Sequence, residues 1–224
     1  MSEGGVLIGF PCERTVMVQA MDGMASVIYR AALHNWDIFN FGYRFTDVAR
    51  NQMAEKLLES DNTWLCMLDS DHRHAPDVVE KLVACALAFP DQVDIVSGLN
   101  FRRGTPYEPM AYRYSDDGRL VPLYRWGEGL IEVDAVATCA VLIHRRVFEA
   151  LKPPWFWFSY REDGRWQGED INFFRRLKRE TKFRVWVHPQ ITSPHLIVDE
   201  VGDDRRYREA LAAQGVVQEN EHDE

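Results

Sequence analysis

The first hundred residues alternate between short apolar runs and longer stretches of helical periodicity. The apolar runs are short enough for single strands, and they cover residues 6–10, 35–41, 63–68 and 93–99. The stretches with helical spacing of apolar positions cover residues 22–34, 46–60 and 76–89. Thr46 is a suitable N-cap, and Pro76 suits the first turn of a helix. This alternation predicts a largely parallel sheet covered by helices.

The pattern changes after residue 100. Residues 101–133 are rich in turn-forming residues, with DDG between short strand-like runs, and they predict hairpins. Residues 133–145 (VDAVATCAVLIHR) are apolar almost throughout and predict one strand. The remaining expected elements are a helix at 145–152 that two prolines end, an aromatic loop at 155–170, a helix at 169–180, a strand at 183–188 and a helix at 203–214.

No internal repeat or low-complexity linker divides the chain. We therefore expect one domain over residues 1–224, with a frayed acidic end at about 215–224. The predicted fold class is α/β: a Rossmann-like domain with a central, mostly parallel sheet flanked by helices, and a small antiparallel hairpin region.

Composition narrows the class of protein. No apolar run has bilayer length, and the start MSEGGVLIGF lacks the features of a signal peptide, so we expect a soluble, cytoplasmic protein without membrane insertion. The four scattered cysteines favour buried free thiols over disulfides or a zinc site. The net charge of −9 argues against nucleic-acid binding through bulk electrostatics, although a local basic groove would escape that objection.

The segment WLCMLDSDHRHAPD drives an apolar strand directly into Asp69 and Asp71. In an open α/β sheet, ligands bind beyond the carboxyl ends of the strands, and residues two apart on extended backbone point to the same side. Two such carboxylates need compensation, and a divalent cation such as Mg²⁺ or Mn²⁺ provides it. The alternative is that DSD only caps the following helix or forms an Asx turn.

Two later segments add candidate chemistry. Glu169 and Asp170 follow Gly168 at the start of an amphipathic helix. They either complement the helix dipole or supply a general base beside a cleft, where the glycine permits close approach of a ligand. His195 follows the last expected core strand, so it is either a structural histidine or a third metal ligand.

Taken in order, these pieces resemble the GT-A glycosyltransferases, which have the nucleotide-diphospho-sugar transferase fold. The resemblance covers roughly residues 5–200 and rests on FPCE, the ARN helix, DSD, VDAVATCAVLIHRRVFE, GEDINFF and the late histidine. The chain departs from the pattern at residues 136–139, where it has VATC and many members have a glycine-rich VGTG stretch. This departure affects how an acceptor or a donor sugar would fit.

The resemblance implies a role for each matching position. Asp170 would deprotonate the acceptor hydroxyl, and Glu169 beside it would orient the acceptor. The metal ligands would be Asp69, Asp71 and His195. The nucleotide and its phosphates would be bound by Pro11, Cys12, Glu13, Arg50, Asp69, Ser70 and Asp71.

Further residues are candidates for substrate binding. Arg102 and Arg103 either clamp an anionic substrate or belong to a solvated loop. Trp157 and Trp166 belong to an aromatic loop that either stacks on acceptor or packs in the core, and Gly168 follows the last aromatic residue of this loop. His72 and His74 are either extra ligands or ordinary polar residues before a helix. We interpret two arginine pairs as surface charge: Arg145–Arg146 and Arg175–Arg176.

The leading hypothesis is a metal-dependent glycosyltransferase of the hexosyltransferase class. It would use Mn²⁺ or Mg²⁺ and a nucleotide-sugar, with a UDP-sugar favoured, to glycosylate a soluble acceptor. The resemblance to family members that carry an ED pair favours inversion, and retention is the alternative, because the sequence does not give the distance from Asp170 to the sugar carbon. A hydroxymethylated base of viral DNA is a second candidate acceptor, which net charge does not favour. Two competing hypotheses are a noncatalytic sugar-nucleotide-binding module and a Mg²⁺-dependent nucleotidyltransferase, for which the sequence offers no Gly- and Lys-rich phosphate loop.

Overall fold

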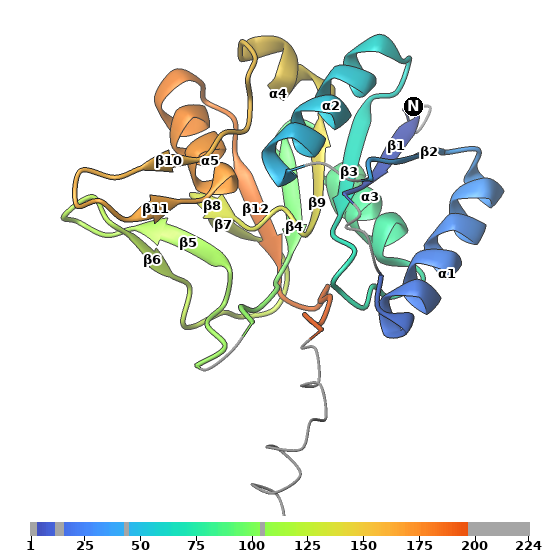
Figure 1. The fold of residues 1–224 in the computed structure, drawn as a ribbon, viewed down its shortest axis with the longest axis horizontal. Helices are drawn as coiled ribbons and strands as arrows, with labels where there is room; N and C mark the ends of the chain where they lie inside the picture. The colour runs from blue at the N-terminus through green and yellow to red at the C-terminus, as the bar shows by residue number, and fades with distance from the viewer. Residues whose placement is uncertain (1–3, 12–15, 43–44, 104–105, 197–224) are drawn as a thin grey trace, which may run out of the picture.

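The computed structural model describes residues 4–11, 16–42, 45–103 and 106–196. Its centre is a seven-stranded sheet with the strand order β2-β1-β3-β9-β4-β12-β7 (Figure 1). The strands of this sheet are β1 (Val6–Phe10), β2 (Asp37–Asn40), β3 (Trp64–Leu68), β4 (Ile95–Gly98), β7 (Ile131–Val133), β9 (Ala140–His144) and β12 (Val185–His188). Strands β7 and β9 run antiparallel to their neighbours, and the other pairs are parallel.

Helices cover both faces of the sheet (Figure 1). They are α1 (Val18–His34), α2 (Thr46–Glu59), α3 (Val78–Ala88), α4 (Arg145–Ala150) and α5 (Glu169–Glu180). Along β3, Leu65 and Met67 pack into the core beneath α2, α4 and α5, whereas Cys66 and Leu68 pack into the core beneath α1 and α3. A strand covered on both faces is apolar at every position, which is why the run at 64–68 shows no alternation.

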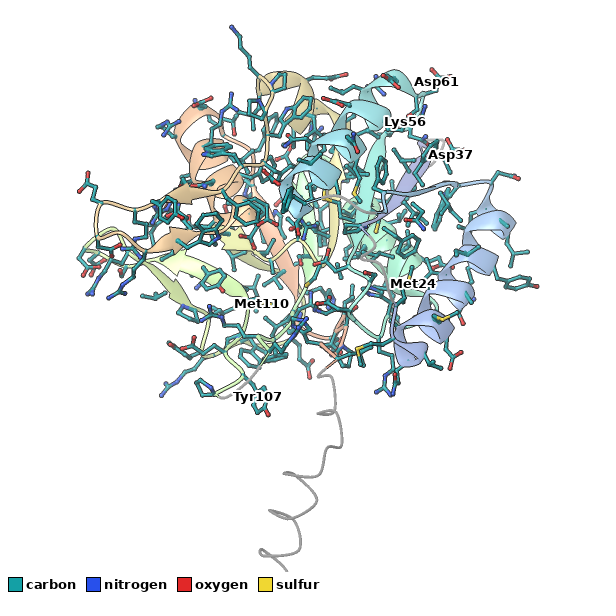
Figure 2. The ribbon with its side chains drawn as sticks, in the orientation of Figure 1. Met24, Asp37, Lys56, Asp61, Tyr107 and Met110 are labelled. Carbon is teal, nitrogen blue, oxygen red and sulfur yellow. The ribbon has the colours of Figure 1, made fainter. Side chains whose placement is uncertain are left out.

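Side chains fill the space between the sheet and its helices (Figure 2). From α1, for example, Met24 packs against the core beneath α1 and α3. Within the part of the chain that the structure describes, no helix is both long and apolar enough to cross a bilayer. The cysteines of this part, Cys66, Cys85 and Cys139, are free thiols.

The described residues also form two small antiparallel sheets. One contains β5 (Ala111–Tyr114), β6 (Leu120–Pro122) and β8 (Ala135–Val136), and the other is the hairpin of β10 (Ser159–Tyr160) and β11 (Trp166–Gln167). The DDG turn joins β5 to β6, and Gly118 there has a φ of +76°, a conformation that glycine adopts without strain. The predicted α/β class, with a mostly parallel central sheet and an antiparallel hairpin region, is confirmed.

The prediction of one strand over residues 133–145 is wrong. Val133 ends β7 in the central sheet, β8 pairs with β5 in the small sheet, residues 137–139 leave the strand, and β9 returns to the central sheet. The carbonyl groups of Thr138 and Cys139 accept hydrogen bonds from Arg50 and from the Asp69 amide. The apolar run therefore breaks at residues 137–139, where two backbone carbonyls bind the Arg50 side chain and the Asp69 amide.

Three smaller expectations also need correction. Thr46 is the first residue of α2 rather than its N-cap; the N-cap is Phe45, and it makes no side-chain cap hydrogen bond. α3 begins at Val78, two residues after Pro76. The loop at 155–170 contains the β10–β11 hairpin. The expected helix at 203–214 and the acidic end lie outside the described residues.

Arg145 is not the surface charge that the sequence suggests. Its guanidinium donates to the carbonyl oxygens of Leu57, Leu58, Ser60 and Asn62 at 2.6–3.2 Å. These carbonyls lie at or just beyond the C-terminus of α2, where backbone acceptors lack intrahelical partners. The arginine at the start of α4 thus anchors the end of α2.

Candidate active site

The candidate site lies where the strand order reverses. β1 pairs with β2 on one side and with β3 on the other, so ligands are expected beyond the carboxyl ends of β1 and β3. The Ser70 hydroxyl donates to the Pro11 carbonyl at 3.0 Å and so joins the two strand ends. Pro11 and the DSD segment are therefore brought together. Cys12 and Glu13 lie outside the described residues.

Arg50 links the DSD segment to α5. From α2, its Nη2 donates to both carboxylate oxygens of Asp69 at 3.0 and 3.1 Å, its Nε donates to Glu169 Oε1 at 3.0 Å, and its Nη1 donates to the Thr138 carbonyl at 3.1 Å. Burial alone would lower the pKa of Arg50, but the charges of Asp69 and Glu169 outweigh burial and raise it. Arg50 is 3 % exposed and faces these carboxylates instead of an open surface.

Asp170 lies in the first turn of α5, beside the buried Glu169. Burial and the charge of Glu169 raise the pKa of Asp170 to about 7, against the opposing effect of Arg50. The phenol of Tyr112 is close enough that burial and the Asp170 charge raise its pKa to about 12. A carboxyl group that titrates near neutral pH can exchange protons with a substrate.

Gly168 occupies the N-cap position of α5 with a φ of −63°, which any residue can adopt. A Cβ atom at this position would come within 2.7 Å of Asp170 Oδ1. The absence of a side chain at Gly168 therefore makes room for the Asp170 carboxylate.

Asp71 belongs to a second cluster with His72 and His195. Asp71 Oδ1 lies 2.7 Å from His72 Nδ1, and Asp71 Oδ2 lies 3.0 Å from His195 Nε2. The two imidazole rings stack with centroids 4.1 Å apart. The hydrogen bond from the Leu196 amide to the Asp71 carbonyl, at 2.9 Å, brings the loop after β12 against the loop after β3.

This second cluster has the composition of a metal site. Asp71, His72 and His195 each offer a ligand atom, and these atoms lie within 4.8 Å of one another. Two buried ring nitrogens, His72 Nε2 and His195 Nδ1, have no hydrogen-bond partner among the described residues. A carboxylate with two imidazoles suits a transition ion such as Mn²⁺ better than Mg²⁺, which prefers oxygen ligands. The residues present therefore fit a divalent transition metal.

The grouping differs from the expected ligand set in one member. Asp71 and His195 lie together as expected, but the Asp69 carboxylate points to Arg50, and His72 is the third member of the group. His74 has a structural position: its Nε2 contacts the Asp69 carbonyl at 2.8 Å and its Nδ1 contacts Ser193 Oγ at 2.9 Å. Burial lowers the pKa of His74 to about 4, so this ring is neutral at pH 7.

The two neighbouring arginines after β4 have different surroundings. Arg102 is exposed and pairs with Glu108 at 3.3 Å. Arg103 contacts both Asp71 and His195, so it is the arginine that reaches the candidate metal site. The sequence pattern could not separate these two adjacent residues, because both follow the same strand.

The aromatic residues before α5 divide between core and surface. Trp155 and Phe156 are buried, and Trp157 is half-buried. Trp166 is 56 % exposed; it stacks on Phe158 and meets Tyr160 edge-on, with ring centroids 5.0 Å apart in each case. The β10–β11 hairpin therefore presents an exposed aromatic surface, in which Trp166 lies three residues before Glu169, the first residue of α5.

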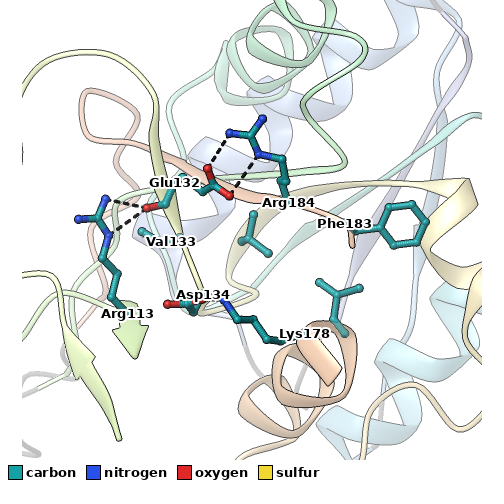
Figure 3. A pocket seen from close by; sticks show the side chains of 9 residues that line it. Arg113, Glu132, Val133, Asp134, Lys178, Phe183 and Arg184 are labelled. Carbon is teal, nitrogen blue, oxygen red and sulfur yellow. Dashed lines mark hydrogen bonds and ion pairs between the residues drawn. The ribbon is translucent and has the colours of Figure 1, made fainter. Parts of the chain in front are cut away.

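A separate pocket of about 290 Å³ lies between β7, the end of α5 and the start of β12 (Figure 3). Four of its charged side chains form two pairs, Arg184 with Glu132 at 2.6 Å and Lys178 with Asp134, and the guanidinium of Arg113 donates to the Glu132 carbonyl. It shares no residue with the carboxylate site described above. Because its charges already have partners, we assign it no ligand.

Comparison of the sequence with protein-family models finds no match, and comparison with curated proteins finds none either. Solved structures do show the fold. The crystal structure of A197 from STIV aligns with a TM-score of 0.60 and 21 % identity over 86 % of each chain. The crystal structure of GalNAc-T7 with UDP, GalNAc and Mn²⁺ aligns with a TM-score of 0.59 and 16 % identity, covering 87 % of this chain and 44 % of that one. The chain thus has a GT-A-like fold and spans less than half the length of GalNAc-T7.

Proposed function

We propose that this protein is a metal-dependent glycosyltransferase that transfers a sugar from a nucleoside-diphosphate donor to an acceptor hydroxyl, with inversion. The observation that carries the proposal is the pair of acidic groups that Arg50 links in a GT-A-like fold, because Arg50 binds both Asp69, two residues before Asp71, and Glu169. One group is Asp71 with two histidines, which suits a metal, and the other is the Glu169–Asp170 pair, which suits proton transfer. A fold alone would not support an activity, because function depends on the site.

The donor side of the site is proposed from the residues beyond β1 and β3. Asp71, His72 and His195 would hold the cation, and Asp69, fixed by Arg50, would lie toward the ribose. A bound divalent cation would supply Lewis-acid stabilisation of the charge that grows on the departing diphosphate. A UDP-sugar with Mn²⁺ is the favoured donor pair, because a similar fold was solved with UDP and Mn²⁺.

The acceptor side is proposed from α5 and the β10–β11 hairpin. Asp170 would accept the proton of the acceptor hydroxyl as that oxygen attacks the sugar carbon. Glu169 would orient the acceptor, since its own carboxylate is fixed by Arg50 at 3.0 Å. The exposed rings around Trp166 would stack on the acceptor. Because the net charge is −9, a soluble, uncharged acceptor is favoured over nucleic acid.

The proposal is tested first by ligand-induced stabilisation. Thermal unfolding would be followed with UDP, GDP and CDP, each with and without Mn²⁺, because a ligand that binds only the folded state raises Tm. We expect a Mn²⁺-dependent rise in Tm with UDP, lost in Asp71→Ala and kept in the matched control Asp61→Ala, whose side chain is exposed at the far end of α2. No rise with any nucleotide, for a folded protein, would refute the donor assignment.

The base assignment needs a separate variant. Asp170→Asn keeps the size of the side chain but cannot accept a proton, so we expect near-normal donor binding with a loss of turnover of about 10²-fold or more. Near-normal turnover in this variant would show that Asp170 is not the base.

A further inference from the structure

The side chain of Arg103 lies against the same two atoms that face each other in the candidate metal site. Its Nη2 contacts Asp71 Oδ2 and lies 3.0 Å from His195 Nε2, and its Nε lies 3.2 Å from that ring nitrogen. Asp71 Oδ2 and His195 Nε2 are themselves 3.0 Å apart. A positive charge of the chain is therefore placed where the carboxylate and the imidazole converge.

The hydrogen bonds of His195 explain why Asp71 needs a cation beside it. Its Nε2 faces a donor, Arg103, and an acceptor, Asp71, and a ring nitrogen can serve only one of them in a given tautomer. When the ring accepts from Arg103, Asp71 Oδ2 has no donor in His195 and relies on the guanidinium for compensation. When the ring instead faces a metal, the same nitrogen becomes a ligand and Arg103 loses its acceptor.

Arg103 is placed so that it can leave. Its side chain is half-exposed, in contrast to the buried Arg50. The base of its loop is held independently, by the hydrogen bond from the Arg102 amide to the Glu108 carbonyl at 2.9 Å and by the bridge between Phe101 and Pro109. The side chain of Arg103 can therefore move while β4 and the loop base stay in place.

A metal and the guanidinium exclude each other at this position. Metal–ligand distances to carboxylate oxygen and imidazole nitrogen are about 2.0–2.2 Å, so an ion bound to Asp71 Oδ2 and His195 Nε2 on the side that Arg103 occupies would overlap Nη2 of Arg103. The positive charges of the bound ion and of the Arg103 guanidinium would also repel each other at so short a distance.

We propose that Arg103 is an intrinsic cation that closes the metal site, neutralising Asp71 until a divalent metal displaces it. This inference rests on the proposed function, because it takes Asp71 and His195 to be metal ligands. Under this proposal, the metal affinity of the free protein depends on how much more strongly the site binds the divalent ion than it binds the Arg103 guanidinium. Arg103 thus has a role that its exposed neighbour Arg102 does not share.

The test is the direct binding of Mn²⁺ to the full chain without nucleotide, followed by the loss of the electron paramagnetic resonance signal of free Mn²⁺. Arg103→Met removes the competing charge but keeps an apolar stem, and Arg102→Met is the matched control. We expect the Kd for Mn²⁺ to fall by about fivefold or more in Arg103→Met and to stay unchanged in Arg102→Met. Circular dichroism would verify that both variants are folded.

The possible results separate the two proposals. Equal or weaker Mn²⁺ binding by Arg103→Met than by the wild type, with measurable binding in both, would overturn the role of Arg103 and leave the metal site standing. Mn²⁺ binding by neither protein up to millimolar concentration would overturn the metal site and the role of Arg103 together. Asp71→Asn distinguishes Mn²⁺ binding at this site from adventitious Mn²⁺ binding, because the variant should lose the site for which Arg103 and Mn²⁺ compete.

Discussion

At the scale of single residues, Arg50 decides how the candidate site is assembled. Two buried or half-buried carboxylates, Asp69 on the β3 end and Glu169 on α5, share its guanidinium at 3.0 Å each. Such a charged group is costly to bury and becomes much more costly when one partner is removed. Arg50 therefore positions both carboxylates, although it lies too deep to face an open surface.

Replacing Arg50 tests this positioning role. Arg50→Met leaves two carboxylates without their common partner, so we expect the free energy of unfolding at pH 7 to fall by about 3 kcal/mol, measured by urea denaturation. Arg50→Lys keeps the charge but cannot bind both carboxylates in the same geometry, and we expect a smaller loss. If Arg50→Met were as stable as the wild type, the ion pairs of Arg50 with Asp69 and Glu169 would make no net contribution to the free energy of unfolding.

The raised pKa of Asp170 has consequences for both activity and stability. A base with a pKa of about 7 must be ionised to act, so we expect kcat to rise as pH passes through about 7. For stability the sign is opposite, because the folded state holds the proton more tightly than the unfolded chain does. The stabilising contribution of protonated Asp170 is present at low pH and is lost as pH rises through its folded pKa.

Asp170→Asn should therefore be more stable than the wild type at pH 8, by roughly 2 kcal/mol, and the advantage should shrink at pH 5. Thermal unfolding of both proteins at the two pH values measures this difference. An advantage that did not change with pH would show that the Asp170 carboxyl is not perturbed by burial.

At the scale of elements, the chain shows which features a linear pattern can predict. β1 and α5 have the predicted boundaries, because a bounded apolar run and an amphipathic period are local properties. The break at residues 137–139 could not be predicted, since it depends on Arg50 and the Asp69 amide, which are distant in sequence. For the same reason the sequence leaves His72, a residue beside the predicted Asp71, as only one of several candidate ligands.

The contact between α4 and the end of α2 is a tertiary helix cap. Arg145→Ala would leave the carbonyls of Leu57, Leu58, Ser60 and Asn62 without this donor, and we expect a loss of about 2 kcal/mol in the free energy of unfolding. The control is Glu149→Ala, which removes only the exposed partner of Arg145 and should change stability by less than about 0.5 kcal/mol. Similar losses in the two variants would contradict the capping role.

At the scale of the whole molecule, the candidate site joins parts of the chain that lie more than a hundred residues apart. The Arg73 amide donates to the Pro194 carbonyl at 2.9 Å, and the Leu196 amide donates to the Asp71 carbonyl at 2.9 Å. His74 and Ser193 add a buried side-chain contact between the same two loops. The proposed metal would thus be held by the loop after β3 and the loop after β12 together.

A ligand shared by two loops should stabilise both, because opening either one would release it. We expect Mn²⁺ to slow amide hydrogen exchange in residues 71–74 and 192–196 by a similar factor, measured by mass spectrometry, with little change in the β5–β6 hairpin. Asp71→Asn should abolish the slowing in both loops at once. Slowing confined to one loop would mean that the metal does not bridge them, and His195 would then be a structural histidine stacked on His72 rather than a ligand.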